Sequence, residues 1–215
     1  FLGAAPGGET TTLGREGSDY TAAIFAYALQ ADEMVIWKDV PGLLNADPKY
    51  FSRTEKLASI SYREAIELSY YGATIIHPKT IKPLQNKNIP LRIKSFVKPG
   101  DEGSIIQNDT AADSLIPSFI FKVDQVLISI IPRDFSFIDE QSLSEILAVF
   151  ASNSIHISLM QNSAISFSVC VDNNQRKLSR LFEELGKDYK VRYNTGLELI
   201  TIRHYDQATI DRVME

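Results

Sequence analysis

The sequence has a single cysteine, no long apolar run and no excess of basic residues. Cys170 has no second cysteine for an internal disulfide, and it lies in an alternating, strand-like run where a small buried side chain is the ordinary interpretation. No apolar stretch is long enough to cross a membrane. The formal net charge of -5 disfavours the basic surface on which nucleic-acid binding depends. We therefore expect neither a membrane nor a nucleic acid as a partner.

The composition is that of an ordinary globular protein. Hydrophobic residues make up 44% and charged residues 23% of 215 residues, which leaves room for one or two domains. The chain opens on Phe1 without a secretory signal and ends in an uncapped helical pattern over 207–215, so we expect further sequence on both sides. These features predict a cytoplasmic protein.

Residues 1–110 alternate short apolar runs with helical stretches, which predicts a layered α/β domain. The expected elements are a helix over 20–29, a strand over 34–37, a helix over 62–71 and a strand over 89–96. Ser61 and Glu64 have capping-box spacing, and Gly72 supplies a left-handed stop, so both ends of the second helix are marked. A cluster of breakers over 97–117 predicts a domain boundary.

Beyond this boundary the pattern reads β-α-β-β-α-β, an α+β ferredoxin-like unit with helices on one face of an antiparallel sheet. The expected elements are strands at 126–130, 155–159, 165–171, 189–193 and 197–202, and helices at 143–150 and 178–185. The predicted domain spans 118–203, and 204–215 would begin a further segment. An extra apolar run at 119–123 is assigned to a neighbouring repeat.

Two polar loops suggest ligand binding. Residues 7–20 form a glycine-rich loop that leads into a helix, where backbone N–H groups favour an anion. The guanidinium of Arg15 could bind a carboxylate or phosphate through two hydrogen bonds. Ser18 and Asp19 suit an N-cap or a contact with a substrate amine. Residues 37–42 leave the end of a predicted strand, where Lys38 could meet phosphates and Asp39 a ribose or metal-bound water. A capped helix and a simple turn are the respective structural alternatives.

The three histidines are far apart in the sequence and form no ligand pattern, so we predict no structural metal site. His77 invites a catalytic interpretation, but no cysteine or acid stands at nucleophile or metal-site spacing beside it. A structural role is the stronger hypothesis.

In this order the loops resemble the aspartate kinases of the amino acid kinase family. The matching motifs are TTLGREGSDYTAA at 11–23, WKDVPG at 37–42 followed by ADPK at 46–49, ISYREAIEL at 60–68 and YGATIIHPKT at 71–80. The resemblance implies that 1–110 is the later half of a kinase domain that uses ATP, with Mg²⁺, to phosphorylate the side-chain carboxylate of L-aspartate. The product, 4-phospho-L-aspartate, starts lysine, threonine and methionine biosynthesis.

By matching position, Arg15, Ser18 and Asp19 would hold aspartate. The implied ATP-binding residues are Lys38, Asp39, Leu44, Lys49, Thr74 and Ile75. The family's early lysine-containing glycine motif is not in this sequence, so we expect the piece alone to be inactive.

Residues 118–203 resemble an ACT domain, a sensor that would bind a regulatory amino acid, lysine or threonine, and pair two chains as a homodimer. The implied effector residues are Phe137, Ile138, Asp139, Ser158, Leu159, Met160, Gln161 and Asn162. Pairing of subunits without effector binding is an alternative for this unit. For the whole chain, the alternatives are the aspartokinase part of a bifunctional enzyme with homoserine dehydrogenase and a non-catalytic amino-acid-binding module.

Overall fold

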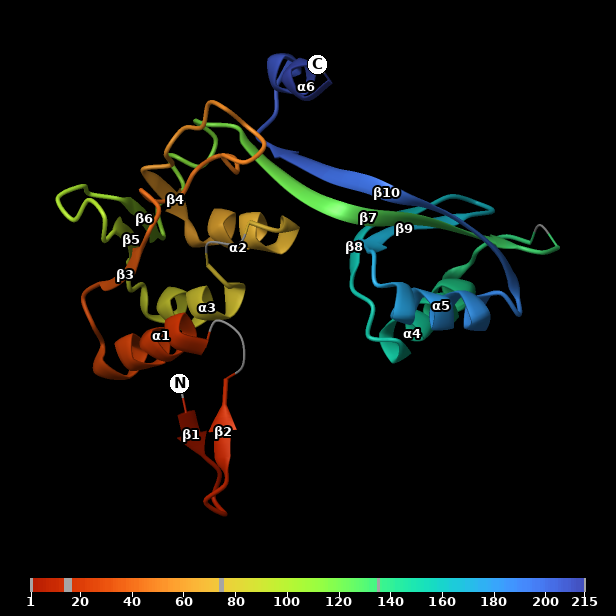
Figure 1. Ribbon diagram of the computed structural model, residues 1–215, viewed down its shortest axis with the longest axis horizontal. Helices are drawn as coiled ribbons and strands as arrows, with labels where there is room; N and C mark the ends of the chain where they lie inside the picture. Colours follow the sequence, from red (N-terminus) through yellow and green to blue (C-terminus); the bar gives the residue numbers. More distant parts are fainter. Residues whose placement is uncertain (1, 14–16, 74–75, 135, 215) are drawn as a thin grey trace. The chain divides into compact units, whose positions relative to one another are not determined.

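The computed structural model describes residues 2–13, 17–73, 76–134 and 136–214 (Figure 1). These residues form two compact units. The first unit contains the described residues up to Ile120 together with those from Thr201 onward, and the second unit is Phe121–Ile200. In the described part of the chain, no helix has both the length and the apolar character needed to cross a bilayer.

The first unit is built on a mixed sheet with the strand order β3-β5-β6-β4. Its strands are β3 (Met34–Lys38), β4 (Ser59–Ser61), β5 (Leu91–Ser95) and β6 (Ser104–Gln107). β3 runs parallel to β5, so the carboxyl ends of these two strands lie at the same edge. Alternate residues of β5 are buried, as its sequence predicts, and Leu91 and Ile93 are inaccessible to solvent.

Three helices of the described chain pack against this sheet, a fourth lies near the C-terminus, and a separate hairpin precedes them all. The helices are α1 (Gly17–Leu29), α2 (Tyr62–Tyr71), α3 (Pro78–Lys87) and α6 (Gln207–Met214), and the hairpin strands are β1 (Leu2–Ala4) and β2 (Thr10–Thr12). α1 buries Ala23 and Ala26 against the core that also contains Ile36. α2 has the predicted bounds, with Ser61 as N-cap and Gly72 at a φ of 121° as C-cap.

The second unit has the predicted β-α-β-β-α-β order, with α4 and α5 on one side of the sheet (Figure 1). Its elements are β7 (Ser118–Pro132), α4 (Glu140–Ser152), β8 (Ile157–Asn162), β9 (Phe167–Asp172), α5 (Gln175–Leu185) and β10 (Tyr189–Arg203). The strand order is β10-β7-β9-β8, so β8 is an outer strand. Inward residues of β7, such as Ile128, pack with Phe150 of α4 and Leu181 of α5 in one core. Cys170 is buried, as expected of a small apolar side chain, and its thiol lies 3.6 Å from Gln125 Oε1.

Three sequence expectations are wrong in detail. The apolar run at 119–123 is part of β7, because this strand begins well before the alternating stretch at 126–130 from which it was predicted. The strands expected at 189–193 and 197–202 are one strand, β10, which continues through Gly196 at a φ of 69°. The breaker-rich segment at 97–117 contains β6, because Gly103 allows the chain to turn tightly and return as a strand.

Gly103 provides a test of this turn. Its φ of 74° and the backbone of Ile93 and Lys94 leave no room for a Cβ, whereas a Cβ on Gly100 meets no heavy atom within 4 Å. We expect Gly103→Ala to lower the free energy of unfolding by about 2 kcal/mol or more, and Gly100→Ala to change it by less than about 0.5 kcal/mol. Urea unfolding followed by the fluorescence of Trp37, the single tryptophan, measures both; equal effects would contradict the account.

Candidate active site

The N-terminus of α1 meets the carboxyl end of β3. Lys38 Nζ lies 3.3 Å from Asp19 Oδ2, and both side chains are largely shielded, with 27% and 20% of their surface exposed. The backbone carbonyl of Lys38 also accepts a hydrogen bond of 2.9 Å from Phe96 N, which fixes the end of β3 to the chain leaving β5. Asp19 and Lys38 are assigned to different ligands by the sequence, and the fold places them side by side.

Free N–H groups at the start of α1 add partial positive charge at this point. Ser18, in the first turn of α1, is exposed to solvent. Arg15, Thr74 and Ile75, which complete the predicted substrate and nucleotide sets, lie outside the described residues. The site can therefore be built only from the positions around them.

The loop after β3 is held in place by buried hydrogen bonds. Leu43 N donates to Ser104 Oγ at 2.9 Å, and Gly42, at a φ of 142°, packs directly against Ser104. The buried Asn45 side chain donates to Pro117 O at 3.0 Å and accepts from Glu55 N at 2.8 Å. These bonds give the loop a defined course.

The predicted nucleotide residues of this loop remain accessible to a ligand. Leu44 is half-buried and forms an isolated bridge with Lys56. Asp39 and Lys49 are exposed, and Lys49 N donates to Asp47 Oδ1 at 2.9 Å in a local turn. The loop thus presents an exposed acid, Asp39, directly after Lys38, and an exposed lysine, Lys49, farther along the chain.

His77 is the N-cap of α3. Its Nδ1 accepts a hydrogen bond of 3.1 Å from Lys79 N, and Pro78 occupies the first helical position. This arrangement supports the structural interpretation of His77. The helix itself was not predicted from the sequence, because Pro78 and Pro83 interrupt a helical reading although both are accommodated here.

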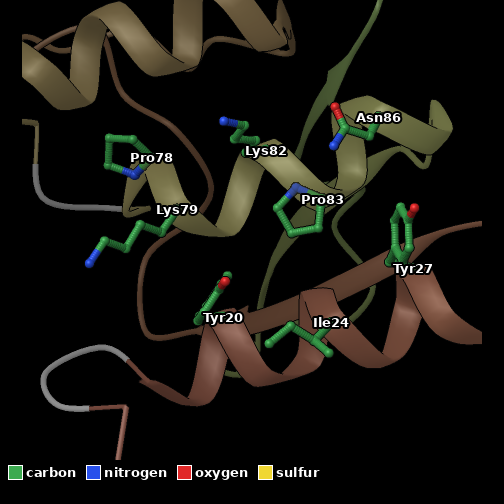
Figure 2. A pocket seen from close by; sticks show the side chains of 8 residues that line it. All are labelled: Tyr20, Ile24, Tyr27, Pro78, Lys79, Lys82, Pro83 and Asn86. Atoms are coloured by element: carbon green, nitrogen blue, oxygen red, sulfur yellow. The ribbon is translucent and has the colours of Figure 1, made fainter.

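A pocket of about 460 Å³ lies between α1 and α3 (Figure 2). Figure 2 shows aromatic and aliphatic side chains of α1 facing prolines and polar residues of α3, the lining being Tyr20, Ile24, Tyr27, Pro78, Lys79, Lys82, Pro83 and Asn86. Among the described residues, none that is assigned to the substrate or the nucleotide lines this pocket.

In the second unit, the loop that carries three predicted effector residues meets the turn after β8, the strand that carries the others. Ile138 N donates to Ala164 O at 2.9 Å, which joins the loop before α4 to the turn after β8. Asp139 caps α4, and hydrogen bonds from the backbone and side chain of Ser142 hold the pKa of the Asp139 carboxyl below its ordinary value. The exposed residues at this place are Phe137, Leu159, Met160, Gln161 and Asn162. Ser158 is half-buried and accepts a hydrogen bond of 3.0 Å from Lys122 Nζ.

Comparison with known proteins agrees with this arrangement. Residues 1–95 match the model of the amino acid kinase family. Lysine-sensitive aspartokinase 3 of Escherichia coli is 30% identical over 210 residues, covering 94% of this chain and 46% of the relative. The chain belongs to the amino acid kinase family, among the aspartokinases.

Two further comparisons extend this result. The solved structure of E. coli aspartokinase III in complex with aspartate and ADP, described as the R-state, superposes with a TM-score of 0.79 at 30% identity and covers 97% of this chain and 48% of that one. A bifunctional aspartokinase/homoserine dehydrogenase of Haemophilus influenzae is 39% identical over 163 residues, covering 70% of this chain and 20% of the relative. The chain thus spans less than half the length of these relatives, and the layered α/β plus ferredoxin-like fold class is confirmed.

One ionic cluster of this aspartokinase chain was missed by sequence reasoning. Glu64, only 5% exposed at its side chain, accepts two hydrogen bonds of 2.8 Å from Arg203, which also lies 3.4 Å from Glu67. His204 Nε2 is 3.1 Å from Glu64 Oε1 but lacks the alignment of a hydrogen bond. The capping-box prediction is half right: Ser61 Oγ accepts from Glu64 N, but Ser61 N donates to Asp113 instead of to Glu64.

This cluster fixes the charge of Glu64. Burial opposes ionisation of its carboxyl, but the hydrogen bonds and positive charge of Arg203, with a smaller contribution from His204, outweigh burial and hold the Glu64 pKa below its ordinary value. Among the described residues, no group of three His, Cys, Asp or Glu side chains is placed to hold a metal ion.

A first prediction concerns His77. Replacing it with Ala removes the cap and should lower the free energy of unfolding by about 1 kcal/mol, whereas Asn keeps a capping acceptor and should cost less than about half of that. Chemical unfolding of both variants measures the difference. If Asn and Ala are equally destabilising, the capping role is wrong.

A second prediction concerns acid stability. Because the folded pKa of Glu64 is depressed, its contribution is complete above its unfolded pKa and is lost as the pH falls through the folded pKa. At neutral pH, Glu64→Gln should cost about 2 kcal/mol. The deficit relative to the unmodified protein should shrink as the pH is lowered from neutral to below the ordinary carboxyl value of 4.5.

Urea midpoints measured across that pH range supply the test. The matched control is Glu33→Gln, which removes the acid of the more exposed Arg92–Glu33 pair, where the two atoms lie 2.7 Å apart. The free energy of unfolding of Glu33→Gln should differ little from that of the unmodified protein at every pH. A Glu64→Gln deficit that does not change with pH would contradict the assignment.

Proposed function

We propose that this chain is part of an aspartokinase and supplies the later half of its catalytic domain and a regulatory unit. The observation that carries the proposal is the contact of Asp19 with Lys38 at the helix start and strand end, with a nucleotide loop fixed beside it. The related E. coli enzyme of similar fold binds aspartate and ADP. In this proposal the catalytic part spans 1–110 and the regulatory unit spans 118–203. Residues 204–215 begin a further regulatory segment.

In the proposed reaction, a side-chain carboxylate oxygen of L-aspartate attacks the γ-phosphorus of ATP. The new bond joins that oxygen to phosphorus, the bond from the γ-phosphorus to the β–γ bridging oxygen breaks, and ADP leaves with the electron pair. Such a transfer depends on positioning and charge neutralisation, so no covalent protein nucleophile is required. Arg15 would hold a carboxylate of aspartate, and Ser18 and Asp19 would orient the substrate.

The nucleotide would lie along the loop after β3. Lys38 would neutralise phosphate charge, and Asp39, Leu44 and Lys49 would line the site together with Thr74 and Ile75. Mg²⁺ would be carried mainly by phosphate oxygens and water. It would reduce the repulsion between the phosphates and the attacking carboxylate.

The second unit is proposed to sense an amino acid, lysine or threonine. The hydrogen bond from Ile138 N to Ala164 O joins the loop before α4 to the turn after β8. The amino acid would bind where this loop and β8 meet. β8 is an outer strand with Leu159 and Met160 exposed, a surface suited to pairing with a second copy as a homodimer. The relative from E. coli is named lysine-sensitive, which supports lysine first.

A second candidate is the aspartokinase part of a bifunctional aspartokinase/homoserine dehydrogenase, favoured by the 39% identity to the H. influenzae enzyme. The full-length sequence distinguishes the two, because a dehydrogenase domain would carry a Gly-x-Gly-x-x-Gly loop between a strand and a helix. A cytoplasmic location stays a prediction for either form.

The proposal is tested with the full-length protein by following ATP- and aspartate-dependent ADP release and trapping the acyl phosphate with hydroxylamine. We expect Lys38→Met to lower kcat/KM for ATP by about a hundredfold or more, because it removes a phosphate-neutralising charge. The matched control is Lys87→Met, which removes a lysine that lies over the Tyr27 ring at the far end of α3 and should leave kcat/KM unchanged.

Unmodified protein that releases no ADP with aspartate would reject the function. Effector binding without ATP binding would instead support the non-catalytic module.

A further inference from the structure

Arg203 ends the strand that leaves the second unit. β10 belongs to the second unit through Ile200, and the residues from Thr201 onward pack in the first unit. Arg203 is therefore covalently continuous with the second unit while its side chain contacts α2 of the first. The next residue, His204, has a φ of 55°, and the strand ends there.

The guanidinium of Arg203 holds α2 at two successive turns. Its Nε and Nη2 donate to Glu64 at 2.8 Å each, and its Nη1 donates to Glu67 at 3.4 Å. Glu64 is nearly inaccessible to solvent, so its carboxylate depends on this partner, because an unpaired buried charge is strongly unfavourable. The position of α2 is therefore sensitive to Arg203.

The far end of α2 holds the chain on both sides of Thr74 and Ile75. Before them, Ala73 N donates to Leu68 O at 2.9 Å. After them, Ile76 O lies 2.8 Å from Ser69 Oγ, whose hydroxyl is also 2.7 Å from Ala65 O. All these partners belong to α2, so the helix fixes the described residues on either side of positions 74 and 75.

We propose that Arg203 and Glu64 are positioning residues for the nucleotide: they fix α2, and α2 holds Ala73 and Ile76, which flank Thr74 and Ile75 in the sequence. The inference rests on the proposed function, in which these two residues line the ATP site. Neither Arg203 nor Glu64 is assigned a contact with ATP or aspartate. Their effect should therefore appear in nucleotide affinity and not in the chemical step.

The test is steady-state kinetics of the full-length protein with Arg203→Gln, Glu64→Gln and the double variant. We expect each single variant to raise KM for ATP about tenfold, with kcat and KM for aspartate changed less than about threefold. The double variant should be no worse than the worse single one, because both break the same interaction. Arg203→Lys keeps the charge but not the two-bonded geometry, and should lie between the unmodified protein and Arg203→Gln.

The matched control is Arg92→Gln, which breaks the more exposed Arg92–Glu33 pair in the same unit and should leave KM for ATP unchanged. A role confined to stability would lower the active fraction and hence the apparent kcat at constant KM. That result, or an unchanged KM in Arg203→Lys and Arg203→Gln, would overturn the proposal.

Titration with ADP separates this inference from the proposed function. If the unmodified protein shows no aspartate kinase activity, the function fails, and ADP affinity then decides the positioning claim. About tenfold weaker ADP binding in Arg203→Gln than in Arg92→Gln supports it. Equal affinity, or no ADP binding by any form, overturns it.

Discussion

The first unit depends on a buried negative charge, that of Glu64, which has one strong partner. Two hydrogen bonds of 2.8 Å from Arg203 allow the carboxylate to stay ionised with almost no access to water. This requirement brings the end of β10 to α2. From α2, hydrogen bonds of Leu68 and Ser69 extend to both sides of a predicted nucleotide segment.

The candidate site relies on backbone geometry more than on unusual side chains. The parallel pairing of β3 and β5 aligns their carboxyl ends, and α1 begins beside Lys38. Such an edge suits phosphate because free N–H groups and a lysine act together. A reaction that needs alignment and charge neutralisation can be supported in this way.

Local signals in the sequence were sufficient for several elements. Ser61 and Gly72 delimit α2 because capping and a left-handed stop involve only neighbouring residues. The alternation of buried residues in β5 and β7 reveals strands for the same reason. Asp19 and Lys38 could be singled out by motif, but their contact depends on the fold.

Other features need information that is distant in the chain. Arg203 lies 139 residues from Glu64, and nothing near either residue indicates the pair. The segment around Gly103 reads as a loop, although its positive φ is what allows β6 to pair with β5. α3 was not predicted because it contains two prolines, which usually interrupt a helix. Pro78 is tolerated because the first helical position needs no N–H partner, and Pro83 is accommodated inside the helix.

Hydrogen exchange of the full-length protein with and without Mg-ADP tests whether this chain forms the nucleotide side of a kinase site. We expect slower exchange over residues 38–49 and 72–80 when ADP is bound, with little change in β8 and α4. Unchanged exchange in both segments at saturating ADP, or protection confined to the second unit, would contradict it.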